Sequence, residues 1–276
     1  MRNILILFVL LGFQFLEAQR NCNMYPEGSP CREACETGSL ASRYPQGSRK
    51  NMELYTKAAQ KCPSFAPAWE QLSVPYLKRG DYLNWKLMID KAVALDPMNI
   101  LGYRAACSYE FIHDVVSALN DFERLDSLKS GHLGYNPNGD YNLRIMKGLC
   151  YRDLGKIDKA IEEIRLAIEE GMKEGGGVGT YDYLHLGVSY LMKKDVDSAF
   201  QYFTLQIPLY KNFPDTYYYL GLCYKAKNQM DLAKSNFEKA KALYPKNHRK
   251  DPYVHMPDQV YLSDIEEELS SLNTSN

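Results

Sequence analysis

The sequence lacks an excess of charge of either sign. Its 276 residues include 33 Lys and Arg against 34 Asp and Glu, which gives a formal net charge of -1. Proteins that bind the phosphate backbone of nucleic acid carry a basic excess, so this balance argues against a nucleic-acid partner. Seven Cys are too few to build the fold on disulfides, and the 45% of hydrophobic residues is ordinary for a chain held by an apolar core.

Long hydrophobic runs are also lacking. The only extended apolar run, from Ile4 to Phe15, has 12 residues, whereas a membrane-spanning helix needs about 20. Arg2 precedes this run, and Ala18 suits a cleavage site. We therefore predict a signal peptide at residues 1–18 and no stable membrane insertion after its removal. Because the one glycosylation sequon lies in the tail and no ER-retention ending is present, a bacterial periplasmic or secreted protein is preferred.

Motifs that indicate catalysis are missing. None of the five His belongs to a His-Glu-x-x-His helix or lies close to a Gly-x-Ser-x-Gly turn. His185 lies between two Leu and is expected to pack or to face solvent. The glycine-rich run 174–179 lacks the Lys-Ser/Thr of a phosphate-binding loop, so we interpret it as a connection between helices. The prediction is a protein that is not an enzyme and needs no cofactor.

What the sequence does contain is an internal repeat. Gly187 and Gly221 are 34 residues apart, and each follows a Leu, with Tyr four residues before and three residues after the Gly. The same spacing recurs at Trp69, Leu72, Ser73 and Tyr76, and at Gly148, Tyr151, Ala160 and Ile164. It places these residues on one face of a first helix, which an Ala and an aromatic or Ile residue of a second helix face.

This pattern resembles the tetratricopeptide repeat family. The resemblance covers about six repeats, at residues 34–66, 67–99, 100–139, 140–173, 180–213 and 214–247. It implies an all-α fold, a right-handed superhelical solenoid of antiparallel helix pairs. Ser73 and Cys107 stand where the family usually has Gly, and Lys147 stands where it usually has Leu.

The two ends of the chain depart from the repeat. Because the last helix pair cannot bury its apolar face alone, a cap is needed. The apolar positions Leu262, Ile265 and Leu269 predict a C-terminal capping helix between the linker and the tail of residues 248–276. Residues 19–33, before the first repeat, are expected to form an irregular segment that contains Cys.

The Cys residues fall into two groups. Three of them take positions in first helices where Gly or Ala is usual, and we expect them to be buried: Cys107, Cys150 and Cys223. The other four, disulfide candidates in an exported protein, are Cys22, Cys31, Cys35 and Cys62. Four Cys allow three pairings, and we favour a disulfide that joins the first two helices. No Cys-x2-Cys or His pair completes a zinc site, so no metal is predicted.

The resemblance implies a binding function, because tetratricopeptide domains generally bind a segment of another protein on the concave face lined by first helices. The predicted groove residues of the last three repeats are Ile145, Leu149, Arg152, Leu184, Val188, Leu191, Tyr218, Leu222 and Lys225. Their apolar character favours an apolar partner segment, with Arg152 and Lys225 orienting an acidic flank. Alternatively, the C-terminal helix or tight superhelical curvature covers them, and they belong to the core. Of Tyr217–Tyr219, only Tyr218 is expected to contact a ligand.

These observations predict a non-catalytic adaptor or assembly factor of the cell envelope that binds a protein or peptide segment. A second interpretation is a self-assembling structural subunit, and thus a homo-oligomer. A third and less favoured one is a thiol-redox or metal protein that uses the Cys cluster near the N-terminus.

Overall fold

The computed structural model describes residues 21–136, 139, 141–246 and 256–274, and the regular structure within these ranges is helical. This confirms the predicted all-α class. The predicted signal peptide, most of the linker after residue 247 and the end of the tail lie outside the described residues. The chain divides into two compact units, residues 1–95 and 96–276. None of the described helices has the length and apolar character needed to cross a membrane.

The described part of the first unit, from residue 21 on, forms two helix pairs. After a short 3-10 helix, η1, four helices follow: α1 (Pro30–Ala41), α2 (Arg49–Lys61), α3 (Ala66–Lys78) and α4 (Tyr82–Leu95). The pairs are α1 with α2 and α3 with α4, and α2 also packs against α3. Tyr55, Phe65 and Leu72 are among the buried residues of its core.

Helix α1 begins earlier than the sequence pattern predicted, within the segment expected to be irregular. The Ser29 side chain accepts a hydrogen bond from the Arg32 backbone N–H at 3.2 Å, and Pro30 occupies the first helical turn. A Ser cap followed by Pro is a favourable helix start, because both satisfy or remove N–H groups that lack partners within the helix. The predicted irregular segment therefore ends at Ser29 and not at residue 33.

Two disulfides close the N-terminal end of this unit. Cys22–Cys35 joins η1 (Cys22–Met24) to α1, with the Cα atoms 5.6 Å apart, and Cys31–Cys62 joins α1 to the residue that ends α2, with 4.9 Å between Cα atoms. The second bond is the favoured link between the first two helices. The remaining three Cys are buried in the second unit. Burial raises the pKa of the Cys223 thiol to about 12 and raises that of Cys150 as well.

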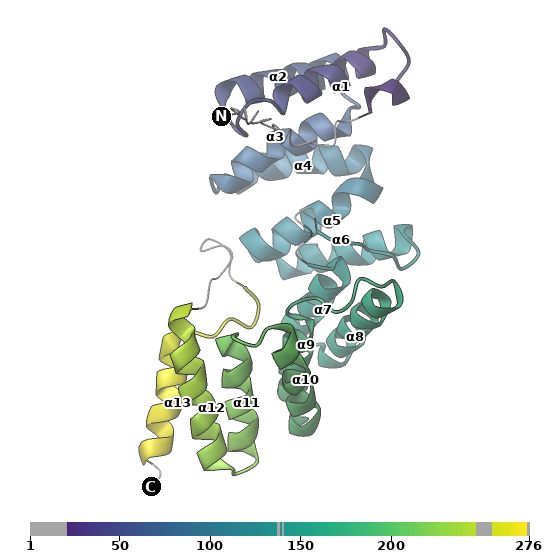
Figure 1. Ribbon diagram of the computed structural model, residues 1–276. Coiled ribbons are helices and arrows are strands. Elements are labelled where there is room, and N and C mark those ends of the chain that lie inside the picture. Colours follow the sequence, from purple (N-terminus) through teal and green to yellow (C-terminus); the bar gives the residue numbers. More distant parts are fainter. Residues whose placement is uncertain (1–20, 137–138, 140, 247–255, 275–276) are drawn as a thin grey trace, which may run out of the picture. The chain divides into compact units, whose positions relative to one another are not determined.

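The described residues of the second unit form four helix pairs and a final helix, which are labelled in Figure 1. In chain order its α-helices are α5 (Pro97–Cys107), α6 (Val115–Leu128), α7 (Leu143–Asp153), α8 (Ile157–Lys173), α9 (Asp182–Met192), α10 (Val196–Leu209), α11 (Pro214–Ala226), α12 (Met230–Leu243) and α13 (Leu262–Thr274). Each odd-numbered helix from α5 to α11 pairs with the next helix, and α13 packs against α12. Helix α13 thus covers the last pair, as a cap does.

Glycine allows the two helices of a repeat to approach closely. A Cβ atom added at Gly221 would lie 2.5 Å from Cε1 of Phe237, and one at Gly187 would lie 2.5 Å from Cε1 of Phe203. Both Phe side chains are fully buried. The Gly and Phe positions of the repeat are therefore two sides of one packing contact.

The interior of the second unit also contains charges. Lys147, where the family usually has Leu, is 5% exposed and forms ion pairs with Asp126 at 2.5 Å and Glu163 at 2.7 Å. Arg144, one turn earlier, pairs with Glu163 at 2.9 Å and Glu170 at 3.1 Å. The departure from the repeat pattern at Lys147 thus supplies a buried ion-pair network between α6, α7 and α8.

Candidate functional site

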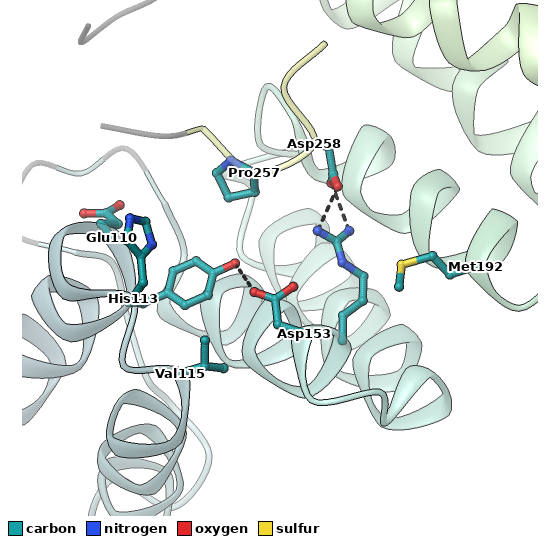
Figure 2. Close-up of a pocket in the computed structure, with 9 residues that line it drawn as sticks. Glu110, His113, Val115, Asp153, Met192, Pro257 and Asp258 are labelled. Atoms are coloured by element: carbon teal, nitrogen blue, oxygen red, sulfur yellow. Dashed lines mark hydrogen bonds and ion pairs between the residues drawn. The ribbon is translucent and has the colours of Figure 1, made fainter. Parts of the chain in front are cut away.

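A cavity of about 300 Å³ lies in the second unit (Figure 2). Its lining residues come from the turn that follows α5 and from the start of α6, from the C-terminal ends of α7 and α9, and from the segment before α13. They are Tyr109, Glu110, His113, Val115, Arg152, Asp153, Met192, Pro257 and Asp258. In Figure 2, Pro257 and Asp258 enter from a segment that is separate from the helices carrying the other labelled residues.

A π-helical turn shapes one wall of this cavity. The turn, η2 (Ser108–Ile112), continues α5 and ends at His113, whose φ of 58° is left-handed. Asp114 then begins α6 by accepting a hydrogen bond from the Ser117 N–H at 3.0 Å. A π turn widens the helix by one residue and redirects the side chains that follow. Here it brings Tyr109, Glu110 and His113 to the cavity.

A buried Arg–Asp–His cluster borders the cavity. The Arg152 guanidinium, on α7, binds both carboxylate oxygens of Asp258, with distances of 2.9 and 2.8 Å. Nδ1 of His185, on α9, lies 2.6 Å from Oδ2 of the same carboxylate. The side chains of Arg152, His185 and Asp258 are 5%, 1% and 6% exposed. Two oxygens held by the planar guanidinium make this the strong, bidentate form of carboxylate binding.

The pKa of Asp258 lies below its ordinary value. Burial alone would raise it, but the positive charge of Arg152 and the hydrogen bond from His185 outweigh burial. Asp258 is therefore a carboxylate at neutral pH. Beside it, the Tyr109 hydroxyl donates a hydrogen bond to Asp153 at 3.0 Å, and burial raises the pKa of Tyr109.

Residues 256–260, which we call the Asp258 turn, are held by their backbone as well. The Tyr219 hydroxyl donates to the Asp258 carbonyl at 3.2 Å, and the Val260 N–H donates to Asp215 at 2.6 Å. Tyr219 and Asp215 both belong to α11. Side chains from three first helices, α7, α9 and α11, therefore bind one short segment of polypeptide through its carboxylate, a carbonyl and an N–H.

Helix α13 continues this contact. Lys225 of α11 forms an ion pair with Glu268 at 2.5 Å, and Ile265 is fully buried in a core shared with α9 and α11. Tyr218 is half-buried; burial and the nearby carboxylates of Glu268 and Asp264 raise its pKa to about 12. Lys225 and Arg152 each bind an acid, but both acids belong to this chain, so their role in orienting an acidic flank of a partner stays a prediction.

The structure places most of the predicted groove residues in the interior. Ile145, Leu149 and Leu184 are at most 1% exposed, and Arg152 and Val188 are also buried. The partly buried ones are Leu191, Tyr218, Leu222 and Lys225. Leu191, Tyr218 and Leu222 pack against a core that includes Val260, Ile265 and Leu272 of the C-terminal segment. This packing agrees with the alternative stated above, in which the C-terminal helix covers the predicted groove residues. Binding of a partner at these residues stays a prediction.

Four residues that contact the Asp258 turn or form it were not among the predicted site residues: His185, Asp215, Tyr219 and Asp258. The expectation that Tyr218 alone of its three-Tyr run contacts a ligand stays a prediction; within the chain it is Tyr219 that binds the turn. The sequence offered a signal in Pro257-Asp258, a turn-forming pair directly before the capping pattern. No pattern identified Arg152 and His185 as the residues that bind Asp258, because they lie 106 and 73 residues earlier in the chain.

Comparisons with known proteins agree with this fold. Two family models, both described as tetratricopeptide repeat, match residues 141–170 and 215–247. The chain therefore contains tetratricopeptide repeats at these residues. No curated protein matches its sequence.

Three solved structures illustrate the likeness. The structure of PilW, a widely conserved type IV pilus biogenesis factor, has a TM-score of 0.61 at 14% identity, and the match covers 87% of this chain and 98% of PilW. YrrB, a tetratricopeptide protein with an unusual peptide-binding site, has a TM-score of 0.54 at 19% identity over 71% of this chain and 95% of YrrB. The APC/C hetero-tetramer Cut9-Hcn1 gives 0.58 at 15% identity, with 87% of this chain covering only 42% of the matched chain. Identities this low concern the fold alone.

Proposed function

We propose that this protein is a non-catalytic adaptor or assembly factor that binds a segment of a partner protein beside the Asp258 turn. The observation that carries the proposal is the turn itself. Side chains of α7, α9 and α11 already bind a short polypeptide through its carboxylate, its carbonyl and its N–H. A surface that holds one peptide segment in this way has the chemistry needed to hold another.

The fold supports the same proposal. Stacked helix pairs present side chains from successive repeats along one surface, which suits an elongated ligand. The cavity adjoins the turn and contains both apolar and charged groups, among them Met192, Val115 and Glu110. A partner segment would find a place there for an apolar side chain and for a hydrogen-bonding one.

We further propose that the protein works outside the cytoplasm, in the envelope or as a secreted protein. Two disulfides close the first unit, and disulfides persist in oxidising compartments. The apolar run from Ile4 to Phe15, with Arg2 before it, has the pattern of a signal peptide. An envelope role also fits the described function of PilW, whose fold is similar.

The test is capture of partners from native envelope extract with a matched pair of variants. Met192, on the cavity wall, is 52% exposed, and Met172, on α8 and outside the cavity lining, is 60% exposed. Met192→Glu and Met172→Glu therefore place the same charge on accessible positions that differ in their relation to the cavity. Circular dichroism first establishes that both variants fold.

The proposal expects a protein that the parent chain and Met172→Glu retain and that Met192→Glu loses. The same proteins recovered with all three chains would contradict binding at the cavity. Recovery of this chain alone would favour the self-assembling subunit, which concentration-dependent mass measurements would then identify.

A further inference from the structure

We propose that Arg152 and His185 form a recognition site for a carboxylate of the partner, and that the Asp258 turn is an internal competitor that fills the site in the free protein. The inference rests on the proposed function and specifies its chemistry. The partner segment presents an Asp or Glu in a turn, with an apolar residue two positions later, as Asp258 and Val260 do here.

The receptor groups belong to the repeats, whereas the carboxylate does not. Arg152 and His185 lie on neighbouring first helices, α7 and α9, and Asp258 lies after the last repeat, 106 and 73 residues further along. The Arg152 guanidinium also donates to the His185 carbonyl at 3.4 Å, which fixes its orientation. The two repeats therefore present a preformed, buried cationic group, and a group of this kind requires an anion.

The internal turn fits the site under some strain. Asp258 adopts a φ of 60°, a left-handed conformation that residues other than Gly adopt less readily, although Asp tolerates it better than most. The turn is closed by the Gln259 N–H, which donates to the Met256 carbonyl at 3.2 Å. Val260, which is 2% exposed, anchors the other side of the turn in the core. The carboxylate and this apolar residue are the features that a competing segment would have to reproduce.

The cavity gives a partner contacts that the internal turn does not make. Pro257 and Asp258 form only one edge of the 300 Å³ space, and the residues that line the rest include Tyr109, His113 and Met192. A tethered segment competes at an effective concentration in the millimolar range, so an external ligand needs additional contacts to displace it. A partner segment longer than the turn can gain them in the cavity.

The contacts that hold α13, directly after the Asp258 turn, can be weakened without altering Arg152 or His185. Lys225 and Glu268 join α11 to α13, and neither residue lines the cavity. Glu268→Lys replaces this attraction by repulsion and leaves Arg152, His185 and Asp258 unchanged. Asp197→Lys is the matched control, because Asp197 pairs with Lys227 through a side chain that is 89% exposed and belongs to α10.

The experiment measures fluorescence anisotropy of a labelled synthetic peptide with the sequence of residues 256–262, titrated with the full chain. We expect weak binding to the parent and to Asp197→Lys, and binding about tenfold tighter to Glu268→Lys, because the tether loses effective concentration. Asp258→Asn in the full chain removes the internal carboxylate and should strengthen peptide binding in the same direction. A peptide that carries Asn in place of its Asp should bind none of these chains measurably.

Equal binding of the Asp and Asn peptides would overturn the inference, as would binding to Glu268→Lys no tighter than to the parent. If Asp258→Asn does not fold, peptide binding to Glu268→Lys, compared with the parent, tests the inference by itself. These results are independent of the capture experiment. A captured partner lost in Met192→Glu, together with a peptide that does not bind, leaves the adaptor function intact and removes only the carboxylate site.

Discussion

The two ends of the described fold are closed by different chemistry. The first helix pair is cross-linked by Cys31–Cys62, and Cys22–Cys35 joins η1 to its first helix. The C-terminal segment, residues 256–274, closes the last repeats without a disulfide. It is held there by the Arg152–Asp258 contact and the Lys225–Glu268 pair. The interiors also differ. Among the described residues of the first unit, the buried polar side chains are uncharged, Asn51 and Ser73, whereas the second unit buries Arg144, Lys147 and Arg152.

Under the proposed function, this difference indicates which end of the fold exchanges an internal contact for a partner. A disulfide stabilises mainly by restricting the unfolded chain and does not exchange with a ligand in an oxidising compartment. An ion pair with a separate segment is reversible, because another carboxylate can replace the first. Under the proposed function, partner binding belongs to the second unit, and the disulfides of the first unit have a structural role.

The largest effect is expected from Asp258→Ala. Removing one member of a buried ion pair leaves the other charge without compensation, which costs about 3–5 kcal/mol. The measurement is the free energy of unfolding of the full chain in urea. A decrease in the free energy of unfolding below about 1 kcal/mol would mean that the Arg152–Asp258 contact contributes no more than an exposed surface ion pair. The contrast between the two ends would then be lost.

Acid should also destabilise the C-terminal end of the fold more than the N-terminal end. The effect should be no larger than that of Asp258→Ala. Because the folded-state pKa of Asp258 is lowered, its contribution to stability is present above the unfolded value of about 3.9 and is lost as pH falls through the folded value. Amide hydrogen exchange in α13 should therefore accelerate in acid, after correction for intrinsic rates, more than exchange in α2. Equal acceleration in both helices would contradict the account.

Replacing Cys31 and Cys62 together by Ser tests the other end. Loss of this disulfide is expected to destabilise the first unit by about 2–4 kcal/mol. Hydrogen exchange should report the change in α1 and α2, while protection of α11 in the second unit stays as in the parent. A loss of protection in α11 of the same size would show that the two ends are not closed independently.

A smaller effect is expected from Gly221→Ala. The new Cβ would meet the Phe237 ring at 2.5 Å, and overpacking of this kind costs about 1–3 kcal/mol. Gly176→Ala is the control, because a Cβ there would come no closer than 3.7 Å to the Gly171 carbonyl oxygen. The melting temperatures of the two variants should differ, with Gly221→Ala lower; equal values would show that the helix pair can relax around the methyl group.

The smallest effect is expected from Glu266→Gln. Glu266 pairs with Lys241 at 2.8 Å, but both side chains are about half exposed, and such pairs contribute about 0–1 kcal/mol. The urea measurement used for Asp258 serves here as well. A loss as large as that of Asp258→Ala would mean that general charge attraction, and not the buried Arg152 site, holds the C-terminal segment.

The fold could be predicted from the sequence because the repeat places the same contact in successive copies. Gly187 and Gly221 mark close approaches that only Gly allows, and Phe203 and Phe237 fill them. The capping helix followed from the apolar spacing of Leu262, Ile265 and Leu269. Such features are local, or recur at a fixed period, and the pattern alone carries them.

The site could be predicted only in part. Arg152 and Lys225 were correctly placed on first helices, and an acidic flank was expected beside them. The acids themselves, Asp258 and Glu268, come from outside the repeats, and no periodicity relates them to Arg152 or Lys225. The contribution of η2 was also missed, because its residues Ser108–Ile112 include no Gly or Pro that would indicate a break in the helix.

The most direct test of the reversible end is hydrogen exchange of residues 256–274 in the parent chain, with and without a saturating amount of the peptide 256–262. If the peptide displaces the Asp258 turn, the Val260 amide and the amides of α13 should exchange faster when it is present, while protection of α7 and α9 is retained. Unchanged exchange in α13, at a peptide concentration shown by anisotropy to saturate the chain, would contradict competition for the Arg152 and His185 site.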